Sequence, residues 1–333
     1  MEIKQLQNFS RIAEIGNLTR AASVLGVTQA ALSRQIAQLE AELATELFRR
    51  NGRGLVLTDA GRRLLDQVPM VLRQISIAER AAKGASGPVQ GTLALGLAPS
   101  LARTVVVPLI GAFRERLPEV TLRTVDGTSA NLGELVGAGK LDCSVIYTPI
   151  SNTTVELRPL ASENLYLVSG PQAAREGCVP PRSVGLEKLS ELPLVISGKT
   201  NVVHGVLAAA LAERGLTAQV VHEIENLTAI LDMVRHGYGY SVIPLSGVQP
   251  CIGDPDLRLH RIRSPRLECG LSIATPARTG NDSLIAESTS LLREVVLKEL
   301  QKYEVEVEKA IDSQADVPAT GQTGTKSRRA RHR

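Results

Sequence analysis

The sequence has no tryptophan, only three phenylalanines and only five tyrosines among its 333 residues. Because hydrophobic residues still make up 43% of the chain, its buried core must be built mainly from aliphatic side chains. No stretch reaches the roughly 18 consecutive apolar residues of a membrane span, and no apolar run precedes Phe9 as a secretion signal would. The sequence therefore predicts no membrane partner.

Cysteine is also scarce, and its four copies (Cys143, Cys178, Cys251 and Cys269) form no C-x-x-C pair. Such spacing argues against both a zinc site and a disulfide framework. The histidines at 204, 222, 236 and 260 lack the partner four residues away that a helical metal site needs. We therefore predict a cytoplasmic, reduced protein without a metal or other cofactor.

The net charge of +4 is distributed unevenly. Residues 1–65 hold nine Lys or Arg against six Asp or Glu, residues 319–333 hold five Lys or Arg and no acid, and acidic residues outnumber basic ones in between. This pattern predicts that the ends contact a polyanion, the alternative being an uneven scatter of surface charge.

The first 65 residues contain two sets of apolar residues at helical spacing, namely Leu6, Phe9, Ile12 and Ala13, then Leu32, Ile36, Leu39 and Leu43. Between them, Thr19 is expected to cap a short helix that Gly26 ends, and Thr28 to cap the next helix. This order predicts a helix-turn-helix. Residues 49–54 (Arg-Arg-Asn-Gly-Arg-Gly) then form a basic turn between two short extended pieces, which is typical of a small wing.

The second helix of a helix-turn-helix enters the DNA major groove. The residues expected to face DNA are Thr28, Gln29, Ala31, Ser33, Arg34 and Gln35 on that helix, with Arg49, Arg50 and Arg53 in the wing. Glutamine can bond adenine, arginine suits guanine or phosphate, and the wing arginines would lie on the backbone or minor groove. A solvated amphipathic helix beside a surface loop is the alternative interpretation.

Residues 58–83 return to a helical pattern in which Leu65, Val68, Leu72, Ile75 and Ala82 alternate by three and four, typical of a helix that pairs with its own copy. We expect Pro69 to kink or loosen this helix, because proline removes one backbone hydrogen bond. The segment 84–88 (Gly-Ala-Ser-Gly-Pro) has the composition of a linker.

From 91 to about 300, short aliphatic runs alternate with helical stretches, which predicts a mainly parallel sheet in two α/β lobes. The expected strands are 92–97, 120–125, 143–147, 165–169, 194–197, 219–223, 240–243 and 269–275, and the expected helices include 100–117, 200–214 and 227–236. Residues 311–333 are predicted to be disordered. Their cations would either add non-specific phosphate contacts or form a dispensable end.

The N-terminal motifs resemble those of the LysR-type transcriptional regulators. They comprise residues 13–22 (AEIGNLTRAA), 25–27 (LGV), 28–36 (TQAALSRQI), 39–40 (LE), 47–50 (LFRR) and 57–61 (LTDAG). The sequence departs from that pattern in two places: Ala30 and Ala31 stand where the family often has one proline, and the basic tail has no counterpart. The opening resembles the branch concerned with nitrogen assimilation control.

The resemblance implies an α+β multidomain chain. It has a winged helix-turn-helix over 1–65, with the wing and the start of the linker helix near 47–58, a linker and dimerisation helix with a hinge over 58–87, and an effector-binding domain over 91–300. That domain has two lobes of the periplasmic-binding-protein type, a first lobe of about 91–161 and 268–300 and a second of about 162–267. The implied partners are double-stranded promoter DNA, a small-molecule effector and copies of the chain in a homodimer or homotetramer, with RNA polymerase as a further candidate.

In that family the effector lies between the lobes. The residues expected there are Ser100, Thr128, Ser129 and Tyr147 from the first lobe, and Ser197, Thr200 and Asn201 from the second. Helix N-termini favour anions, so a carboxylate-bearing metabolite is the expected effector, although ordinary capping also explains these residues. Some relatives have arginine in place of Tyr147, so we do not expect a strongly dianionic ligand.

Other functions are less consistent with the sequence. Residues 197–200 (Ser-Gly-Lys-Thr) look like the end of a P-loop, but Pro193 stands where the first glycine is needed. A solute-binding protein without DNA function, or an α/β enzyme acting in the cleft, stays open as an alternative. Neither class needs the basic winged segment, so we predict a non-enzymatic regulator.

Overall fold

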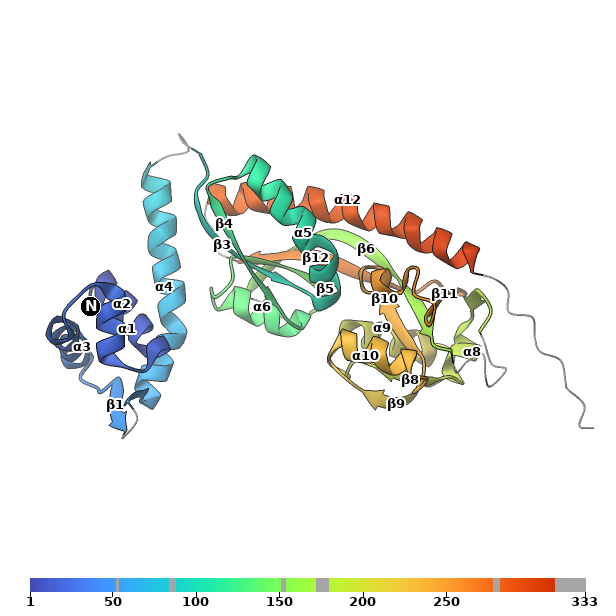
Figure 1. The fold of residues 1–333 in the computed structure, drawn as a ribbon, viewed down its shortest axis with the longest axis horizontal. Helices are drawn as coiled ribbons and strands as arrows, with labels where there is room; N and C mark the ends of the chain where they lie inside the picture. The colour runs from blue at the N-terminus through green and yellow to red at the C-terminus, as the bar shows by residue number, and fades with distance from the viewer. Residues whose placement is uncertain (52–53, 84–87, 151–153, 172–179, 278–281, 315–333) are drawn as a thin grey trace, which may run out of the picture.

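The computed structural model describes residues 1–51, 54–83, 88–150, 154–171, 180–277 and 282–314. It contains an N-terminal head, a long helix beside it and a larger body of two lobes (Figure 1). Arg53, Cys178 and the linker at 84–87 lie outside the described residues, as do 315–333. None of the described helices is both long and apolar enough to cross a membrane.

The head consists of three helices and a two-stranded wing: α1 (Ile3–Ile15), α2 (Leu18–Leu25), α3 (Gln29–Leu43), β1 (Phe48–Asn51) and β2 (Gly54–Leu57). The apolar residues that share the inner faces of these helices are buried, as predicted: Leu6, Phe9, Ile12, Leu32, Ile36 and Leu39. Leu43, at the end of α3, is an exception because it is exposed. The phenyl rings of Phe9 and Phe48 lie 5.3 Å apart and join the wing to this core.

The predicted helix boundaries are confirmed with one correction. Gly26 ends α2 in the left-handed conformation, and Thr28 Oγ1 caps α3 by accepting a hydrogen bond from Ala31 N at 3.2 Å. The cap of α2 is Asn17 rather than Thr19, because Asn17 Oδ1 accepts from Arg20 N at 3.0 Å. Thr19 is the second residue inside the helix.

The wing is tied to α3 and to the following helix, α4 (Asp59–Lys83), by polar contacts. Glu40 Oε1 accepts hydrogen bonds from the backbone N–H groups of Leu47 at 2.7 Å and Phe48 at 3.1 Å. Thr58 caps α4 by accepting from Gly61 N at 3.0 Å. A Cβ atom at Gly61 would come within 2.1 Å of the Leu47 carbonyl oxygen, so only glycine allows α4 to start this close to the wing.

The first half of α4 belongs to the head. Val68 is only 1% exposed and lies in the head's core, with Leu65 and Leu72 packed partly buried against it. Part of the face predicted to pair with a second copy is therefore already covered within the chain. Pro69 does not interrupt the helix, which runs through it as one element.

The middle of α4 also contacts the body. Arg73 Nε pairs with Asp142 Oδ1 at 2.7 Å, and both side chains are largely buried. The other oxygen of Asp142 accepts from Ala94 N at 2.6 Å, and Lys140 pairs with Asp66 of α4 at 3.2 Å. The helix thus joins the head to the body through direct side-chain contacts.

The body is built on a mixed sheet in the order β4-β3-β5-β12-β6-β11-β7, with β10 also paired to β6. Its strands are β3 (Gly91–Leu97), β4 (Val120–Asp126), β5 (Cys143–Thr148), β6 (Val155–Ser169), β7 (Ser183–Val184), β10 (Ser241–Pro244), β11 (Arg258–Ile262) and β12 (Glu268–Pro276). A separate parallel pair consists of β8 (Pro193–Ile196) and β9 (Gln219–Glu223). The body's described helices are α5 (Pro99–Arg116), α6 (Ser129–Gly137), α8 (Leu186–Ser190), α9 (Val202–Ala212), α10 (Leu227–Arg235), α11 (Leu245–Val248), the short 3-10 turn η1 (Gln249–Cys251) and α12 (Ser283–Ser313).

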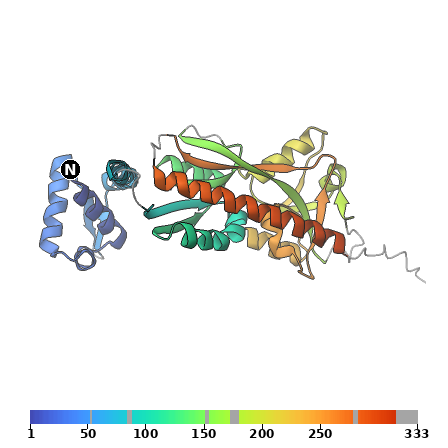
Figure 2. The ribbon, with the colours of Figure 1, turned by 90° about the horizontal axis from the view of Figure 1, so that it is seen from above.

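Strand β6 passes through both lobes. It pairs with β12 from Val155 to Asn164, and then with β10 and β11 from Leu165 to Ser169. We call the part with β3, β4, β5, β12, α5 and α6 lobe I, and the part with β7–β11 and α8–α11 lobe II. Helix α12 runs lengthwise across both lobes (Figure 2).

The predicted strands are present, but the predicted mainly parallel sheet is wrong. Strand β12 is antiparallel to β5 and β6, and β6 is antiparallel to β10 and β11. Sequence reasoning also missed β7, β11 and the first part of β6, which contains Pro159. Proline argues against a strand, and the sheet accommodates it with a register shift opposite Leu271 and Ser272.

The end of the described chain also differs from the prediction. Helix α12 continues to Ser313, and Ile311 is fully buried, so residues 311–313 are part of the body rather than of a disordered tail. Arg261 of β11 holds this last turn through Glu308 at 2.6 Å and Asp312 at 2.7 Å.

Replacing Gly61 with alanine should destabilise the head, because the new Cβ must displace the Leu47 carbonyl. We expect Gly61→Ala to lower the free energy of unfolding by about 1–3 kcal/mol. Gly111→Ala is the matched control, since this glycine also lies inside a helix and has no atom within 4 Å of a Cβ position. The control should be neutral or stabilise by up to about 1 kcal/mol. Urea denaturation measures both, and equal effects would contradict the packing argument.

Candidate functional site

The outer face of α3 carries the residues predicted to read DNA. Thr28, Gln29, Ala31, Ser33 and Arg34 are exposed, while Leu32, Ile36 and Leu39 hold the opposite face in the core. Gln29 Oε1 accepts a hydrogen bond from Thr19 Oγ1 at 3.3 Å, which draws its side chain toward α2. Gln35 differs from the others because it is half-buried and its Oε1 accepts from Asn8 Nδ2 at 2.5 Å. Gln35 is therefore held toward α1.

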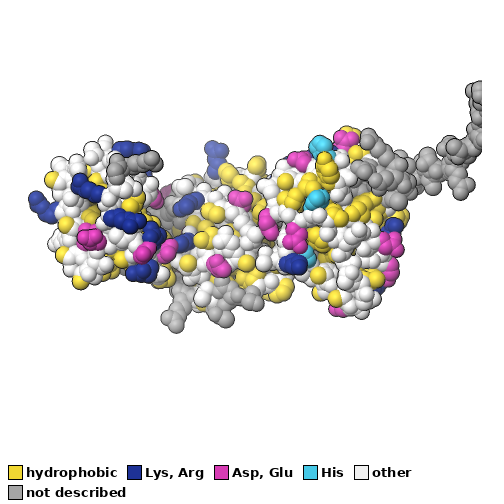
Figure 3. Space-filling view, turned by 90° about the horizontal axis from the view of Figure 1, so that it is seen from below, with side chains coloured by type: hydrophobic (Ala, Val, Ile, Leu, Met, Phe, Trp, Pro, Cys, Tyr) yellow, Lys and Arg dark blue, Asp and Glu magenta, His cyan; other side chains and the backbone are white. Residues whose placement is uncertain are grey.

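The wing presents basic side chains beside this face. Arg49 and Arg50 follow the buried Phe48 on β1 and are exposed, and Arg53 lies outside the described residues. Lys and Arg side chains gather on the head in Figure 3. The head thus combines an exposed polar helix with a basic wing, which is the surface that duplex DNA requires.

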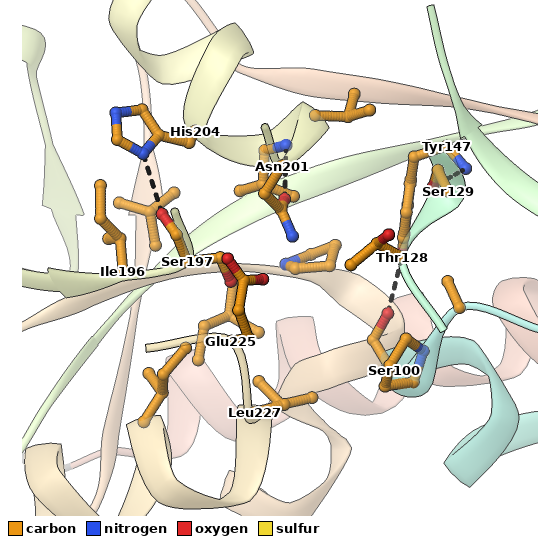
Figure 4. A pocket seen from close by; sticks show the side chains of 18 of the residues that line it. Ser100, Thr128, Ser129, Tyr147, Ile196, Ser197, Asn201, His204, Glu225 and Leu227 are labelled. Atoms are coloured by element: carbon orange, nitrogen blue, oxygen red, sulfur yellow. Dashed lines mark hydrogen bonds between the residues drawn. The ribbon is translucent and has the colours of Figure 1, made fainter. Parts of the chain in front are cut away.

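A cleft between the two lobes contains the other predicted site. It forms an open hollow that measures about 800 Å³ when the open solvent within it is included. All seven residues predicted for the effector line it, namely Ser100, Thr128, Ser129, Tyr147, Ser197, Thr200 and Asn201. Figure 4 shows Ser100 and Thr128 on one side, facing Ser197 and Asn201 on the other.

Helix N-termini position most of these residues. Ser100 lies in the first turn of α5, and Thr128 Oγ1 caps α6 by accepting from Asn131 N at 3.4 Å. Asn201 Oδ1 caps α9 by accepting from Val203 N at 3.0 Å. Ser129 Oγ accepts from Tyr147 N at 3.0 Å, which ties α6 to the end of β5. The caps therefore serve the helices and shape the cleft at once.

The cleft also contains residues that the sequence reasoning missed. Glu225 follows β9 and accepts a hydrogen bond from Gly198 N through Oε1 at 3.2 Å. His204, on α9, contacts the carbonyl oxygen of Ser197 through Nδ1 at 2.8 Å. Ser241 begins β10 and is 1% exposed. Glu225 precedes a helix, as Thr200 does, and this position is the signal that could have identified it. Its distance along the sequence from the loop after β8 gave no indication that the two meet in the cleft.

A buried polar cluster lies behind the cleft. The hydroxyl oxygen of Tyr147 is 2.9 Å from Ser100 Oγ and 3.0 Å from Ser246 Oγ, and it donates to Glu163 Oε1 at 3.4 Å. Ser246 N donates to Glu163 Oε2 at 2.8 Å, and Thr104 Oγ1 donates to the Ser246 carbonyl at 2.8 Å. Since α5 and β5 belong to lobe I and α11 to lobe II, this cluster joins the lobes directly beneath the cleft.

The electrostatics of this cluster follow from its burial. Desolvation raises the pKa of Glu163 to about 7, although hydrogen bonds from Ser246 and Tyr147 oppose the shift. Desolvation, then the nearby Glu163, raises the pKa of Tyr147 well above its ordinary value, so the phenol keeps its proton. A carboxyl group with this pKa changes its charge near neutral pH.

The described cysteines, unlike Glu163, do not change their charge near neutral pH. Cys143, Cys251 and Cys269 are buried, and desolvation raises the pKa of each thiol to about 12. These three thiols are protonated at neutral pH and therefore poor nucleophiles. Within the described ranges, no group of three His, Cys, Asp or Glu side chains is arranged to hold a metal ion.

The stability of the lobes should fall as the pH rises through the titration of Glu163. Because the pKa is about 7 in the folded chain and 4.5 in the reference state, the folded protein binds more protons between these values. Its stabilising contribution is complete below about pH 4.5 and lost by about pH 7, on the order of 3 kcal/mol in total. Denaturation of wild type and Glu163→Gln from pH 5 to 8 measures this. The difference between the two should change with pH in that window, and a constant difference would count against a titrating Glu163.

Comparison with known proteins assigns the head and the body to one family. Residues 3–62 match the model of the bacterial regulatory helix-turn-helix protein, lysR family, and residues 86–297 match the LysR substrate binding domain. The nitrogen assimilation regulatory protein nac of Klebsiella aerogenes is 32% identical over 279 residues, 84% of this chain and 90% of that protein. The HTH-type transcriptional regulator BbuR of Bordetella bronchiseptica is 28% identical over 297 residues, 89% of each chain.

Solved structures show the same fold. CbnR complexed with its target DNA aligns with a TM-score of 0.66 at 23% identity, over 89% of this chain and 100% of that one. A full-length OxyR variant from Pseudomonas aeruginosa aligns with a TM-score of 0.68 at 22% identity, over 89% and 97%. With family models covering both the head and the body, the chain belongs to the LysR family of transcriptional regulators.

Proposed function

We propose that the chain binds promoter DNA sequence-specifically and that a carboxylate-bearing small molecule in the inter-lobe cleft modulates this binding. The observation that carries the proposal is the pairing, in one chain, of an exposed helix-turn-helix face with a cleft lined by helix N-termini. A solute-binding protein or a cleft enzyme would have no use for the head. We therefore assign the cleft a ligand that is bound and released unchanged.

In the proposed DNA complex, the N-terminal half of α3 enters the major groove. Gln29, Ser33 and Arg34 would contact base edges or nearby phosphates, with Thr28 and Ala31 beside them. Arg49 and Arg50, and Arg53 beyond the described residues, would contact the backbone or minor groove. Gln35 would not contact bases directly but would orient α3, because its amide oxygen accepts a hydrogen bond from Asn8 of α1.

We propose that the chain works as a homodimer or homotetramer. Val68 lies in the head's core and Leu65 and Leu72 pack against it, so the half-buried Ile75 is the part of the periodic seam that α4 retains for pairing with a second α4. A symmetric dimer would read a partly palindromic operator. A ligand with unequal affinity for two arrangements of the lobes would shift their populations and so change the spacing of the heads. Contact between the bound regulator and RNA polymerase is a further part of this proposal.

The roles of α3 and the wing can be separated by salt. Gln29→Ala should lose about 1–3 kcal/mol of discrimination at one base pair, because a bidentate contact to a base is removed. Arg50→Ala should weaken binding to all sequences about equally and reduce the salt slope by about one, because it removes one phosphate contact. Gel retardation of the upstream region and of single-base variants, at several salt concentrations, measures both. Uniform losses for both variants would contradict the assignment.

The cleft can be tested by ligand-induced stabilisation. In a thermal-shift screen of organic acids and amino acids, a true ligand near saturation should raise the Tm of wild type by roughly 5 °C. The rise should disappear in Ser100→Ala and in Thr128→Val, which each remove one hydroxyl at a helix N-terminus in the cleft. Thr217→Val, at an exposed position outside the cleft, is the matched control and should keep the rise. A ligand whose effect survives both cleft changes binds elsewhere.

A further inference from the structure

The charges of the cleft limit the ligands that it can bind. Among the described residues that line it, there is one carboxylate, Glu225, and neither lysine nor arginine. A ligand with only negative charge would therefore meet a carboxylate across the cleft without a permanent cation to balance it. The lining favours a ligand whose own positive group faces Glu225.

Glu225 is placed to meet such a group. Its Oε1 accepts from Gly198 N at 3.2 Å, which fixes the carboxylate against the loop after β8. The side chain is exposed, and no ion pair to it is present among the described residues. Figure 4 shows the carboxylate facing the space between Ser197, Asn201 and Thr128. One edge of the carboxylate is thus held by the protein while the other is open to the cleft.

Lobe I offers the complementary site for an anion. The N-terminus of α5 has no side-chain cap, because Ala98 occupies the capping position and Pro99 follows it. Ala98, Ser100 and Thr128 all line the cleft, so the N-termini of α5 and α6 both open onto it. The uncapped N–H groups of α5 and the dipoles of both helices favour a carboxylate there.

A third, independent feature points to a ligand that completes the cleft. Ser241 is 1% exposed and lines the cleft, and its Oγ has no hydrogen-bond partner among the described residues. A buried hydroxyl without a partner is unfavourable unless a bound group supplies one. A polar group of a ligand that reaches Ser241 at the start of β10 would supply this partner.

We propose, building on the proposed effector site, that the ligand of the cleft is a zwitterion such as an amino acid. Its carboxylate lies at the N-termini of α5 and α6, its ammonium group pairs with Glu225, and a polar group reaches Ser241. Each lobe then holds one charge of the ligand, so the ligand favours the arrangement in which the lobes are close enough to hold both. A ligand lacking either charge loses the contact to one lobe.

The test uses the full chain and pairs of probes that differ by one charge. Isothermal titration measures binding of the twenty amino acids, 4-aminobutanoate and 5-aminopentanoate, and of the carboxylic acids and amines that lack one of the two charged groups. At least one zwitterion should bind about tenfold or more tightly than its carboxylic acid and its amine counterparts. The inclusion of ω-amino acids distinguishes a ligand with adjacent charges from one with separated charges.

Two variants with matched controls assign the contacts. Glu225→Gln should weaken the zwitterion about tenfold or more and leave its carboxylic acid counterpart unchanged. Glu213→Gln removes the same charge from an exposed residue at the far end of α9, outside the lining, and should leave both unchanged. Ser241→Ala should weaken the zwitterion about two- to tenfold. Ser144→Ala removes a hydroxyl that is also buried and unpartnered but does not line the cleft, and it should have no effect on affinity.

The outcomes separate this proposal from the broader one. Carboxylic acids that bind as tightly as their amino acid counterparts, with Glu225→Gln neutral, would overturn the zwitterion and leave a carboxylate effector in place. Amines that bind as tightly as amino acids would overturn both the zwitterion and the carboxylate. Absence of binding by every zwitterion in the panel also overturns the proposal. DNA retardation by the head does not depend on any of these results.

Discussion

The arrangement of the two lobes depends on β6, a single strand that runs through both of them and that none of its partner strands matches over its whole length. Nine of its first ten residues pair with β12, the register shift leaving out Leu160, and its last five pair with β10 and β11. The backbone hydrogen bonds of one strand thus belong to two lobes. Glu163 lies close to the point where the partners change, and its carboxylate holds Ser246 of lobe II and Tyr147 of lobe I. Main-chain pairing along β6 therefore positions the two walls of the cleft. Beneath the cleft, the contact between the lobes includes the carboxyl group of Glu163, so the protonation of this group bears on that contact.

Helix α4 imposes a second constraint because it packs on both the head and lobe I. Val68 is in the head's core, while Arg73 forms a largely buried pair with Asp142, which also accepts a hydrogen bond from Ala94 N in the middle of β3. Breaking a buried pair leaves an uncompensated charge, so this contact is costly to lose. A change in lobe I thus has a continuous packed path to the head, through one aspartate and one helix.

The head was predictable from sequence because its signals are local. Helical spacing, caps and a basic turn fall within a few residues of one another. The error in the caps, Thr19 for Asn17, is a choice between two neighbouring capping residues, and Leu43 departs only at the end of α3. The body was predictable only in its strands and helices. Strand direction is not encoded in an alternating pattern, and Pro159 hid half of β6 because the irregular pairing that tolerates it comes from β12.

The candidate sites show the same division. Residues at helix starts, such as Ser100 and Thr128, could be found because capping residues mark where strands end and helices begin. Glu163 could not, because a glutamate between Ser162 and Asn164 resembles a solvent-facing position until α11 covers it. Glu225 does precede a helix, but its place in the cleft, like that of Ser241, depends on how lobe II folds. The fold brings the end of β9 and the start of β10 beside the loop that follows β8.

Helix α12 limits how the regulator can move. It contacts α5 of lobe I through Arg116 and Glu294, and it contacts lobe II through Arg261, which pairs with Glu308 and Asp312. This helix of 31 residues contacts lobe I and lobe II and runs along one side of the body. A wide opening of the cleft would break the ion pairs of Arg261 with Glu308 and Asp312. A twist about the long axis of α12 would keep these pairs intact. The contacts of α12 therefore oppose a hinged opening of the lobes more than they oppose a torsion of the body.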